Sequence, residues 1–351
     1  MSQRLNFNSD NVSGVAPQVL AAIAAANAGQ VGSYGADPFT ERLTARAREL
    51  FECELAIVPV TTGTAANALA LSLLAPPYGA IYCHETAHVM TDECGAPEFY
   101  AGGAKLIGLP GPFGRIAPAS ITNAVAFARS MGVHYVKPAA VTLSQATEWG
   151  TIYDLATLDQ LCATARGAGL GIHMDGARFA NALARLGCSP AEATWKRGVE
   201  VLSLGATKNG ALAAEAVVLF DVTRREELEL RRKRSGHLWS KMRFLSAQLL
   251  AYLDAELWLV NARHANSLAD RLGAGLIAAG GRLVAPIEAN EVFVALTAQQ
   301  IAALRSVGYV VHDWPAPAGE AEPVIRLVAA YDMQTADVDA LLRALPRRAS
   351  N

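Results

Sequence analysis

The sequence has no excess of charge of either sign, since 30 lysines and arginines are balanced by 32 aspartates and glutamates. A net charge of −2 offers no basic surface for nucleic acid or an anionic membrane, so we expect neither as a partner. No apolar run reaches the roughly 18 residues that a membrane-spanning helix requires, and the N-terminal stretch lacks the apolar core of a signal peptide. These absences predict a soluble, cytoplasmic protein.

Cysteine is scarce, and its spacing suggests neither disulfides nor metal sites. The five cysteines are odd in number, and no Cys-x-x-Cys pair or zinc-ligand spacing occurs. Such usage is typical of a reducing compartment. His84, Glu85 and His88 come near a zinc-protease motif, but the His-Glu-x-x-His pattern needs one residue fewer between the histidines. We therefore expect no catalytic metal.

Glycine-rich nucleotide motifs are also missing, because the chain has neither Gly-x-Gly-x-x-Gly after a strand nor a Walker P-loop. What the chain does have is apolar residues, 52% of the total, which are enough for a large core. Buried-strand patterns alternate with helical patterns up to about residue 220, which predicts an α/β fold with a mainly parallel sheet covered on both faces. We predict a large domain over residues 1–255 and a small α+β domain over residues 256–351.

One strand-to-helix turn has the character of an anion site. Thr61-Thr-Gly-Thr64 follows the apolar strand Ala56–Val60 and precedes an alanine-rich helix. Unpaired N–H groups and the helix dipole favour a phosphate there. Gly63 would allow close approach of the backbone, and Thr64 would add a hydroxyl. An ordinary helix cap formed by Thr64 is the alternative interpretation of the same residues.

Two further strand ends carry an aspartate and a lysine. Asp175 closes the apolar strand 169–175, at the edge where open α/β sheets bind ligands. Lys208 follows the strand 199–204, and a partly desolvated lysine amine can form a Schiff base with an aldehyde. Taken alone, Lys208 is better explained as a solvated loop lysine, and the alternative for Asp175 is a helix cap. Together with the phosphate turn they predict a site for pyridoxal phosphate (PLP), with Asp175 beside the pyridine nitrogen.

This combination resembles the threonine aldolase branch of the fold-type I, aspartate-aminotransferase-like PLP enzymes. It is most similar to the low-specificity L-threonine aldolase and phenylserine aldolase group, from about Phe7 to Leu345. The resemblance implies that Lys208 is the Schiff-base lysine. It also implies that Asp175-Gly-Ala-Arg178 binds the cofactor ring through both charged residues, and that Thr62-Gly63-Thr64 binds its phosphate.

The same resemblance assigns residues around the cofactor. His88, with Glu93 five residues later, matches a histidine that stacks on the ring and is a candidate catalytic residue. Ser9 and Arg326 match residues that bind the substrate carboxylate. Tyr34, in Tyr34-Gly-Ala-Asp-Pro, matches a tyrosine that reaches the site of a neighbouring subunit. The resemblance thus implies a homo-oligomer, either a dimer with shared sites or a tetramer.

The activity implied by the resemblance is cleavage of an L-β-hydroxy-α-amino acid (threonine, allo-threonine or phenylserine) to glycine and an aldehyde. Many relatives carry Asn-Thr-His-Asn near the substrate hydroxyl, whereas this chain has Ser144-Gln-Ala-Thr-Glu148. The base for the hydroxyl proton is therefore His88, His84, Glu148 or a water. The alternatives are another fold-type I activity, such as a β-eliminating lyase or an aminotransferase, and a catalytically silent cofactor-binding protein.

Overall fold

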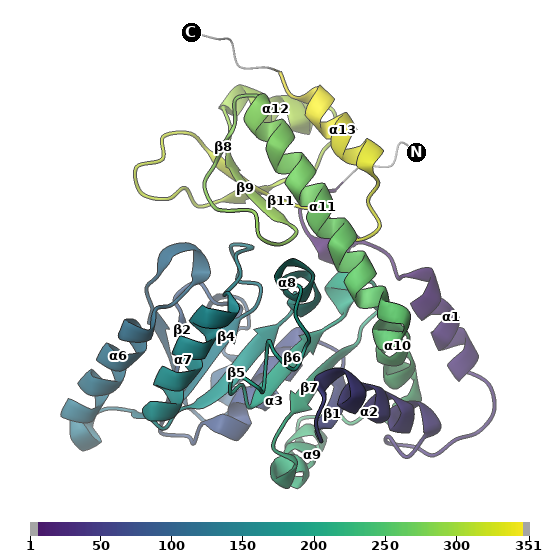
Figure 1. Cartoon of the computed structure of the whole chain (residues 1–351), viewed down its shortest axis with the longest axis vertical. Coiled ribbons are helices and arrows are strands. Elements are labelled where there is room, and N and C mark those ends of the chain that lie inside the picture. Colours follow the sequence, from purple (N-terminus) through teal and green to yellow (C-terminus); the bar gives the residue numbers. More distant parts are fainter. Residues whose placement is uncertain (1–5, 347–351) are drawn as a thin grey trace.

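The structure is a computed structural model that describes residues 6–346. It contains two sheets (Figure 1): a large one between layers of helices and a small one that packs under the long helix α11 (Leu257–Ala278). The large sheet has the strand order β1-β7-β6-β5-β4-β2-β3, and the small sheet has the order β10-β11-β9-β8. Within residues 6–346, no helix combines the length and the apolar character needed to cross a membrane.

The large sheet is almost entirely parallel, which confirms the predicted α/β class. Its strands are β1 (Ala56–Val60), β2 (Gly79–His84), β3 (Lys105–Leu109), β4 (Lys137–Ser144), β5 (Gly171–Gly176), β6 (Val201–Gly205) and β7 (Glu215–Leu219). Only β7 is antiparallel to its neighbours, β1 and β6. The first residue of β7, Glu215, consequently pairs with the last residues of both neighbours, Val60 and Gly205, at the edge where the parallel strands end.

The helices of the large domain follow from apolar patterning and local caps. They are α1 (Pro17–Ala26), α2 (Pro38–Phe51), α3 (Gly63–Leu74), α4 (His88–Thr91), α5 (Ala96–Tyr100), α6 (Pro118–Ser130), α7 (Leu155–Gly167), α8 (Phe179–Leu186), α9 (Arg225–Arg234) and α10 (Arg243–Leu253). Asp37 caps α2 by accepting the backbone N–H groups of Phe39 and Thr40, and Pro38 suits the first helical position. Helix α3 is buried from Ala65 to Leu73, which explains its alanine-rich, apolar sequence.

The C-terminal part has its own hydrophobic core. Strands β8 (Arg282–Leu283), β9 (Glu291–Ala295), β10 (His312–Trp314) and β11 (Val324–Val328) form the small antiparallel sheet, covered by α11, α12 (Ala298–Ser306) and α13 (Thr335–Ala344). Leu268, Leu272 and Leu276 of α11 share this core with Val294 and Ile325. The domain boundary at residues 255–256 stays a prediction, and it falls in the short 3-10 turn Asp254–Glu256 before α11.

Candidate active site

Lys208 lies at the edge where the parallel strands end, in the 3-10 turn Thr207–Asn209 that follows β6. The buried carboxylate of Glu215 accepts the N–H groups of Ala206 (2.9 Å) and Thr207 (3.3 Å), so it fixes the backbone just before the lysine. Burial raises the pKa of Glu215 to about 7. Within residues 6–346, no hydrogen bond or ion pair engages the amine of Lys208, which leaves it available to a ligand.

The other side of the lysine turn is anchored to the helices. The side chain of Asn209 donates one hydrogen bond to the Tyr252 hydroxyl (2.9 Å) and one to the Trp258 carbonyl (2.8 Å). Asn209, Tyr252 and Trp258 are all buried, so these bonds are shielded from water. The turn is therefore held from both ends without any contribution from the lysine side chain.

Asp175 is the penultimate residue of β5 and begins a chain of side-chain hydrogen bonds. Its Oδ1 accepts the N–H of Ala177 (3.0 Å), and its Oδ2 accepts the amide of Asn67 (2.8 Å). Asn67 also donates to Glu93 (2.7 Å), whose carboxylate bonds with Nδ1 of His88 (2.9 Å). The bond from Glu93 raises the pKa of His88. The two predicted residues Asp175 and His88 are thus linked through Glu93, which belongs to the sequence pattern of His88, and through Asn67, which had no predicted role.

The predicted phosphate turn is open to solvent. Helix α3 begins at Gly63, and its cap is Thr62, whose hydroxyl accepts the N–H of Ala65 (3.1 Å); the alternative cap Thr64 was wrong, because Thr64 is already inside the helix. A Cβ built on Gly63 would meet no atom within 4 Å. In the described chain, the N–H groups of Gly63 and Thr64 have no partner, so they are free to bind an anion.

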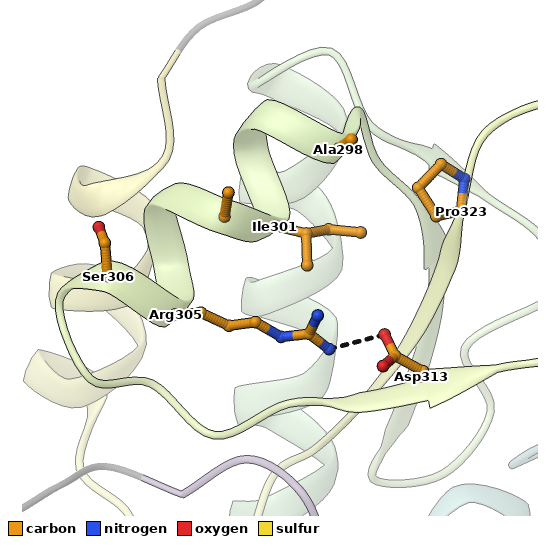
Figure 2. Close-up of a pocket in the computed structure, with 7 residues that line it drawn as sticks. Ala298, Ile301, Arg305, Ser306, Asp313 and Pro323 are labelled. Carbon is orange, nitrogen blue, oxygen red and sulfur yellow. Dashed lines mark hydrogen bonds and ion pairs between the residues drawn. The ribbon is translucent and has the colours of Figure 1, made fainter.

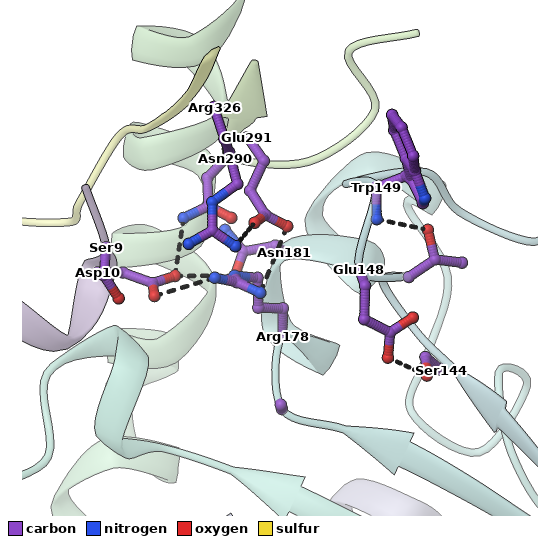
Figure 3. Close-up of polar contacts among 12 residues, drawn as sticks. Ser9, Asp10, Ser144, Glu148, Trp149, Arg178, Asn181, Asn290, Glu291 and Arg326 are labelled. Atoms are coloured by element: carbon purple, nitrogen blue, oxygen red, sulfur yellow. Dashed lines mark hydrogen bonds and ion pairs between the residues drawn. The ribbon is translucent and has the colours of Figure 1, made fainter. Parts of the chain in front are cut away.

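Arg178 and Arg326 converge with three polar residues of distant segments (Figure 3). Arg178 forms two hydrogen bonds with Asp10, of 2.8 and 3.0 Å, and its Nη1 lies 3.3 Å from Glu291. Asn290 also donates to Asp10 (3.1 Å). Although burial alone would raise the pKa of Asp10, the Arg178 guanidinium holds it below its usual range. This cluster ties the N-terminal segment, including Ser9, to the edge of the large sheet.

Arg326 extends from β11 toward the same cluster. Its Nη1 lies 3.6 Å from Glu291, and its Nη2 donates to the Asn8 carbonyl (3.2 Å). The guanidinium also packs over the ring of Trp314 at 5.2 Å. Trp314 in turn contacts Trp149 and Phe293, with ring centroids 5.5 and 4.9 Å away. The aromatic residues that support Arg326 thus come from both the small sheet and the loop after β4.

The candidate bases for a substrate hydroxyl differ in how fully they are engaged. Both ring nitrogens of His84 have partners, the Thr86 hydroxyl and the Gly111 carbonyl, each at 2.9 Å. One oxygen of Glu148 accepts from the Ser144 hydroxyl (2.7 Å) and from the N–H of His88 (2.9 Å). Its other oxygen is buried and lacks a partner within the described residues. Burial raises the pKa of Glu148, which makes this carboxylate a stronger base than an exposed one.

Tyr34 lies apart from these buried groups. Its side chain is half-exposed, and its ring faces Lys233, with the amine 5.0 Å from the ring centroid. Its N–H donates to the Ser240 carbonyl (2.9 Å). Within one subunit Tyr34 is therefore a surface residue, and its role in a neighbouring site stays a prediction.

A separate hollow lies in the small domain (Figure 2), between α12 and the strand β10. Its two charged residues, Arg305 and Asp313, pair with each other at 2.7 Å. Neither charge is left for a ligand, so we assign this hollow no part in the site.

Comparison with known proteins agrees with this geometry. Residues 6–299 match the family described as beta-eliminating lyase. A low specificity L-threonine aldolase of Pseudomonas aeruginosa is 48% identical over 305 residues, which cover 86% of this chain and 87% of that protein. The chain belongs to the threonine aldolase family. Within this family, the threonine aldolase of Leishmania major superimposes with a TM-score of 0.90 at 28% identity, covering 97% of this chain and 98% of that one.

More distant PLP enzymes share the fold of this member of the threonine aldolase family. A solved structure of SPT with PLP has a TM-score of 0.68 at 18% identity and covers 97% of this chain and 85% of that chain, which shows likeness of fold alone. The predicted family and the fold-type I class are confirmed.

Sequence reasoning assigned no role to several buried polar residues around the site: Asp10, Asn67, Glu215, Asn290 and Glu291. Asn67, Glu215, Asn290 and Glu291 lie in or beside apolar stretches, whereas Asp10 lies among polar residues. A position in or beside an apolar stretch is a signal by itself, because buried polar groups need partners. The sequence alone does not indicate the partners of these residues, because Asp10, Asn67 and Glu291 interact with segments far away along the chain.

Proposed function

We propose that this protein is a PLP-dependent carbon–carbon lyase that cleaves L-β-hydroxy-α-amino acids such as threonine to glycine and an aldehyde. The observation that carries the proposal is the arrangement at one sheet edge of the unengaged amine of Lys208, the buried carboxylate of Asp175 and the open N-terminus of α3. The 48% identity to a low specificity L-threonine aldolase supports the same reaction.

The residues present fit PLP. Lys208 offers an amine for the aldehyde, Asp175 a carboxylate for the pyridine nitrogen, and Gly63 and Thr64 two N–H groups for the phosphate. We propose that His88 packs on the ring and that Arg178 borders the same site. When bound, PLP supplies an electron sink for the electron pair that is released at Cα when the Cα–Cβ bond breaks.

The remaining residues bind the substrate and move its protons. Arg326, with Ser9, holds the α-carboxylate, because a planar guanidinium matches a carboxylate in two hydrogen bonds. A base takes the proton from the β-hydroxyl oxygen as the Cα–Cβ bond breaks, which turns Cβ into the aldehyde carbon. Lys208 then donates a proton to Cα, where the proton replaces the broken bond to Cβ, and glycine leaves.

We propose Glu148 as the base for the hydroxyl proton. The ring of His84 is fully engaged, and the hydrogen bond from Glu93 favours the protonated form of His88, which is a poor acceptor. Glu148 keeps one buried oxygen without a partner in the described chain. A carboxyl whose pKa is raised by burial is also a stronger base than an exposed one.

Changing Glu148 to glutamine is expected to lower kcat by about 10²–10⁴-fold, the usual contribution of a general base. The glutamine oxygen can still accept from Ser144 and from the N–H of His88, so the loop keeps its anchor. In the wild type, kcat should fall as pH drops through the raised pKa of Glu148, and this acidic limb should vanish in the variant. Glu256→Gln, at an exposed position, is the matched control. Full activity with an unchanged pH profile would assign the proton transfer to His88 or a water.

The reaction itself is tested with purified protein reconstituted with PLP and supplied with L-threonine, L-allo-threonine and L-phenylserine. We expect equimolar glycine and aldehyde from at least one substrate. Formation of 2-oxobutyrate from threonine in place of glycine would identify a β-eliminating lyase. No turnover of any of the three would contradict the aldolase proposal.

We further propose a homo-oligomer, either a dimer with shared sites or a tetramer, in which Tyr34 reaches a neighbouring subunit. The half-exposed ring of Tyr34 supports this assignment. We also propose the division into domains 1–255 and 256–351. We also propose a cytoplasmic location, which the cysteine usage supports because it is typical of a reducing compartment.

A further inference from the structure

Glu291 is a buried carboxylate whose role the proposed reaction does not explain. It is the first residue of β9, and its side chain is completely buried. The ladder pairs Glu291 with Val328 and pairs Phe293 with Arg326, so Glu291 and Arg326 are diagonal neighbours on one face of the small sheet. The fold therefore places an acid next to the arginine proposed to bind the substrate carboxylate.

The contacts of Glu291 are close but incomplete. Its Oε2 lies 3.3 Å from Nη1 of Arg178, and its Oε1 lies 3.6 Å from Nη1 of Arg326. Among the described residues, neither oxygen has a hydrogen-bond partner, and Nε of Arg326 has none either. By contrast, Asp10 forms two well-formed bonds with Arg178. Glu291 is thus held by charge rather than by hydrogen bonds, which makes it the easier of the two carboxylates to separate from its arginine.

The two guanidinium groups nearest Glu291, those of Arg178 and Arg326, already face two carboxylates, Glu291 and Asp10. Arg178 approaches Glu291 from the β5–α8 connection, Arg326 from β11, Asp10 from the N-terminal segment and Lys208 from the turn after β6. The loop residue Gly150 closes the remaining side, where a Cβ would come within 2.9 Å of the Glu291 side chain. A substrate carboxylate on Arg326 would add a third acid to two guanidinium groups in a site shielded from water.

We propose that Glu291 is an internal counter-ion of Arg326 that the substrate α-carboxylate displaces, taking up a proton as it does so. This inference rests on the proposed role of Arg326 in substrate binding. Glu291 then sets both the strength and the pH dependence of carboxylate binding. Burial raises the pKa of Glu291, and a second carboxylate on Arg326 raises it further, which is the physical origin of the proton uptake.

The test compares glycine with methylamine, which has the same amine but no carboxylate. Binding of each to the PLP-loaded protein is measured by spectrophotometric titration between pH 6.5 and 9, and by calorimetry in buffers of different ionisation enthalpy. In the wild type, binding of glycine should be accompanied by the uptake of more protons than binding of methylamine. The affinity of the protein for glycine, relative to its affinity for methylamine, should fall as pH rises.

Changing Glu291 to glutamine keeps the size of the side chain and removes its charge. At a pH above the pKa that Glu291 has in the complex, the variant should bind glycine more tightly, by roughly tenfold for each pH unit by which the ligand raises that pKa. Methylamine affinity should be unchanged, and the extra proton uptake should disappear. Glu256→Gln is the surface control and should behave like the wild type.

Two outcomes would overturn the proposal. If Glu291→Gln binds glycine more weakly, the acid orients Arg326 instead of competing with the ligand. If the wild type shows equal proton uptake for glycine and methylamine, no exchange takes place, and this result does not depend on the folding of any variant. The variant Arg326→Ala tests the premise that Arg326 binds the substrate carboxylate. If this variant binds glycine as tightly as the wild type does, relative to methylamine, the proposed carboxylate site itself is wrong.

Discussion

Changing Lys208 to alanine is expected to lower kcat by about 10³-fold or more, because the amine is proposed both to bind the cofactor covalently and to return a proton to Cα. The backbone of the turn should be unaffected. Glu215 holds it through the N–H groups of Ala206 and Thr207, and Asn209 anchors its other end. The loss would therefore report on the amine and not on the shape of the loop.

The Lys208→Ala variant is best measured by a covalent trap as well as by turnover. Borohydride reduction of the PLP-loaded wild type should add the mass of the cofactor to the peptide that contains Lys208, and the variant should show no such adduct. Lys196→Ala is the matched control, since Lys196 is an exposed lysine paired with Glu52. A cofactor adduct on a different lysine, or wild-type turnover in the variant, would reject the assignment.

Changing Asp175 to asparagine is expected to lower kcat by about 10²–10³-fold, comparable to the loss of one preorganised charge-stabilising group. Both carboxylate oxygens accept hydrogen bonds, from Ala177 and Asn67. The amide must place an N–H against one of these donors, which also perturbs the chain through Glu93 to His88. We thus expect weaker cofactor binding in addition to slower turnover.

The two effects of Asp175→Asn are separated by measuring kcat at saturating PLP and the dissociation constant for PLP independently. Asp270→Asn serves as the control, because Asp270 pairs with Arg185 at the surface. A variant with weakened PLP binding but wild-type kcat at saturation would show that Asp175 only anchors the cofactor and does not support the electron sink.

The site residues that could be predicted from the sequence are those that lie at or just after the ends of strands. Asp175 and Lys208 each follow an apolar run, and parallel strands bring such ends to one edge of the sheet. The turn at Gly63 could be predicted for the same reason, with only its capping residue misplaced by the alternative interpretation. Local pattern and chain direction were sufficient for these residues.

The charge network could not be predicted in this way. The pairs of Asp10 with Arg178 and of Glu291 with Arg326 arise when the N-terminal segment and the small sheet dock on the large sheet. The antiparallel direction of β7 could not be predicted either, because an apolar strand has the same pattern of residues in both directions. That direction alone places Glu215 beside the lysine turn.

The antiparallel strand β7 also has a consequence for the order in which the chain acquires its shape. In the large sheet β1 has a single neighbour, β7, although the two strands are far apart in the sequence. During synthesis, β1 leaves the ribosome long before Glu215–Leu219 has been made, and it has no strand to pair with until then. We therefore expect the turn after β1, which we propose binds the phosphate, to assemble late, because it awaits a contact of high sequence separation.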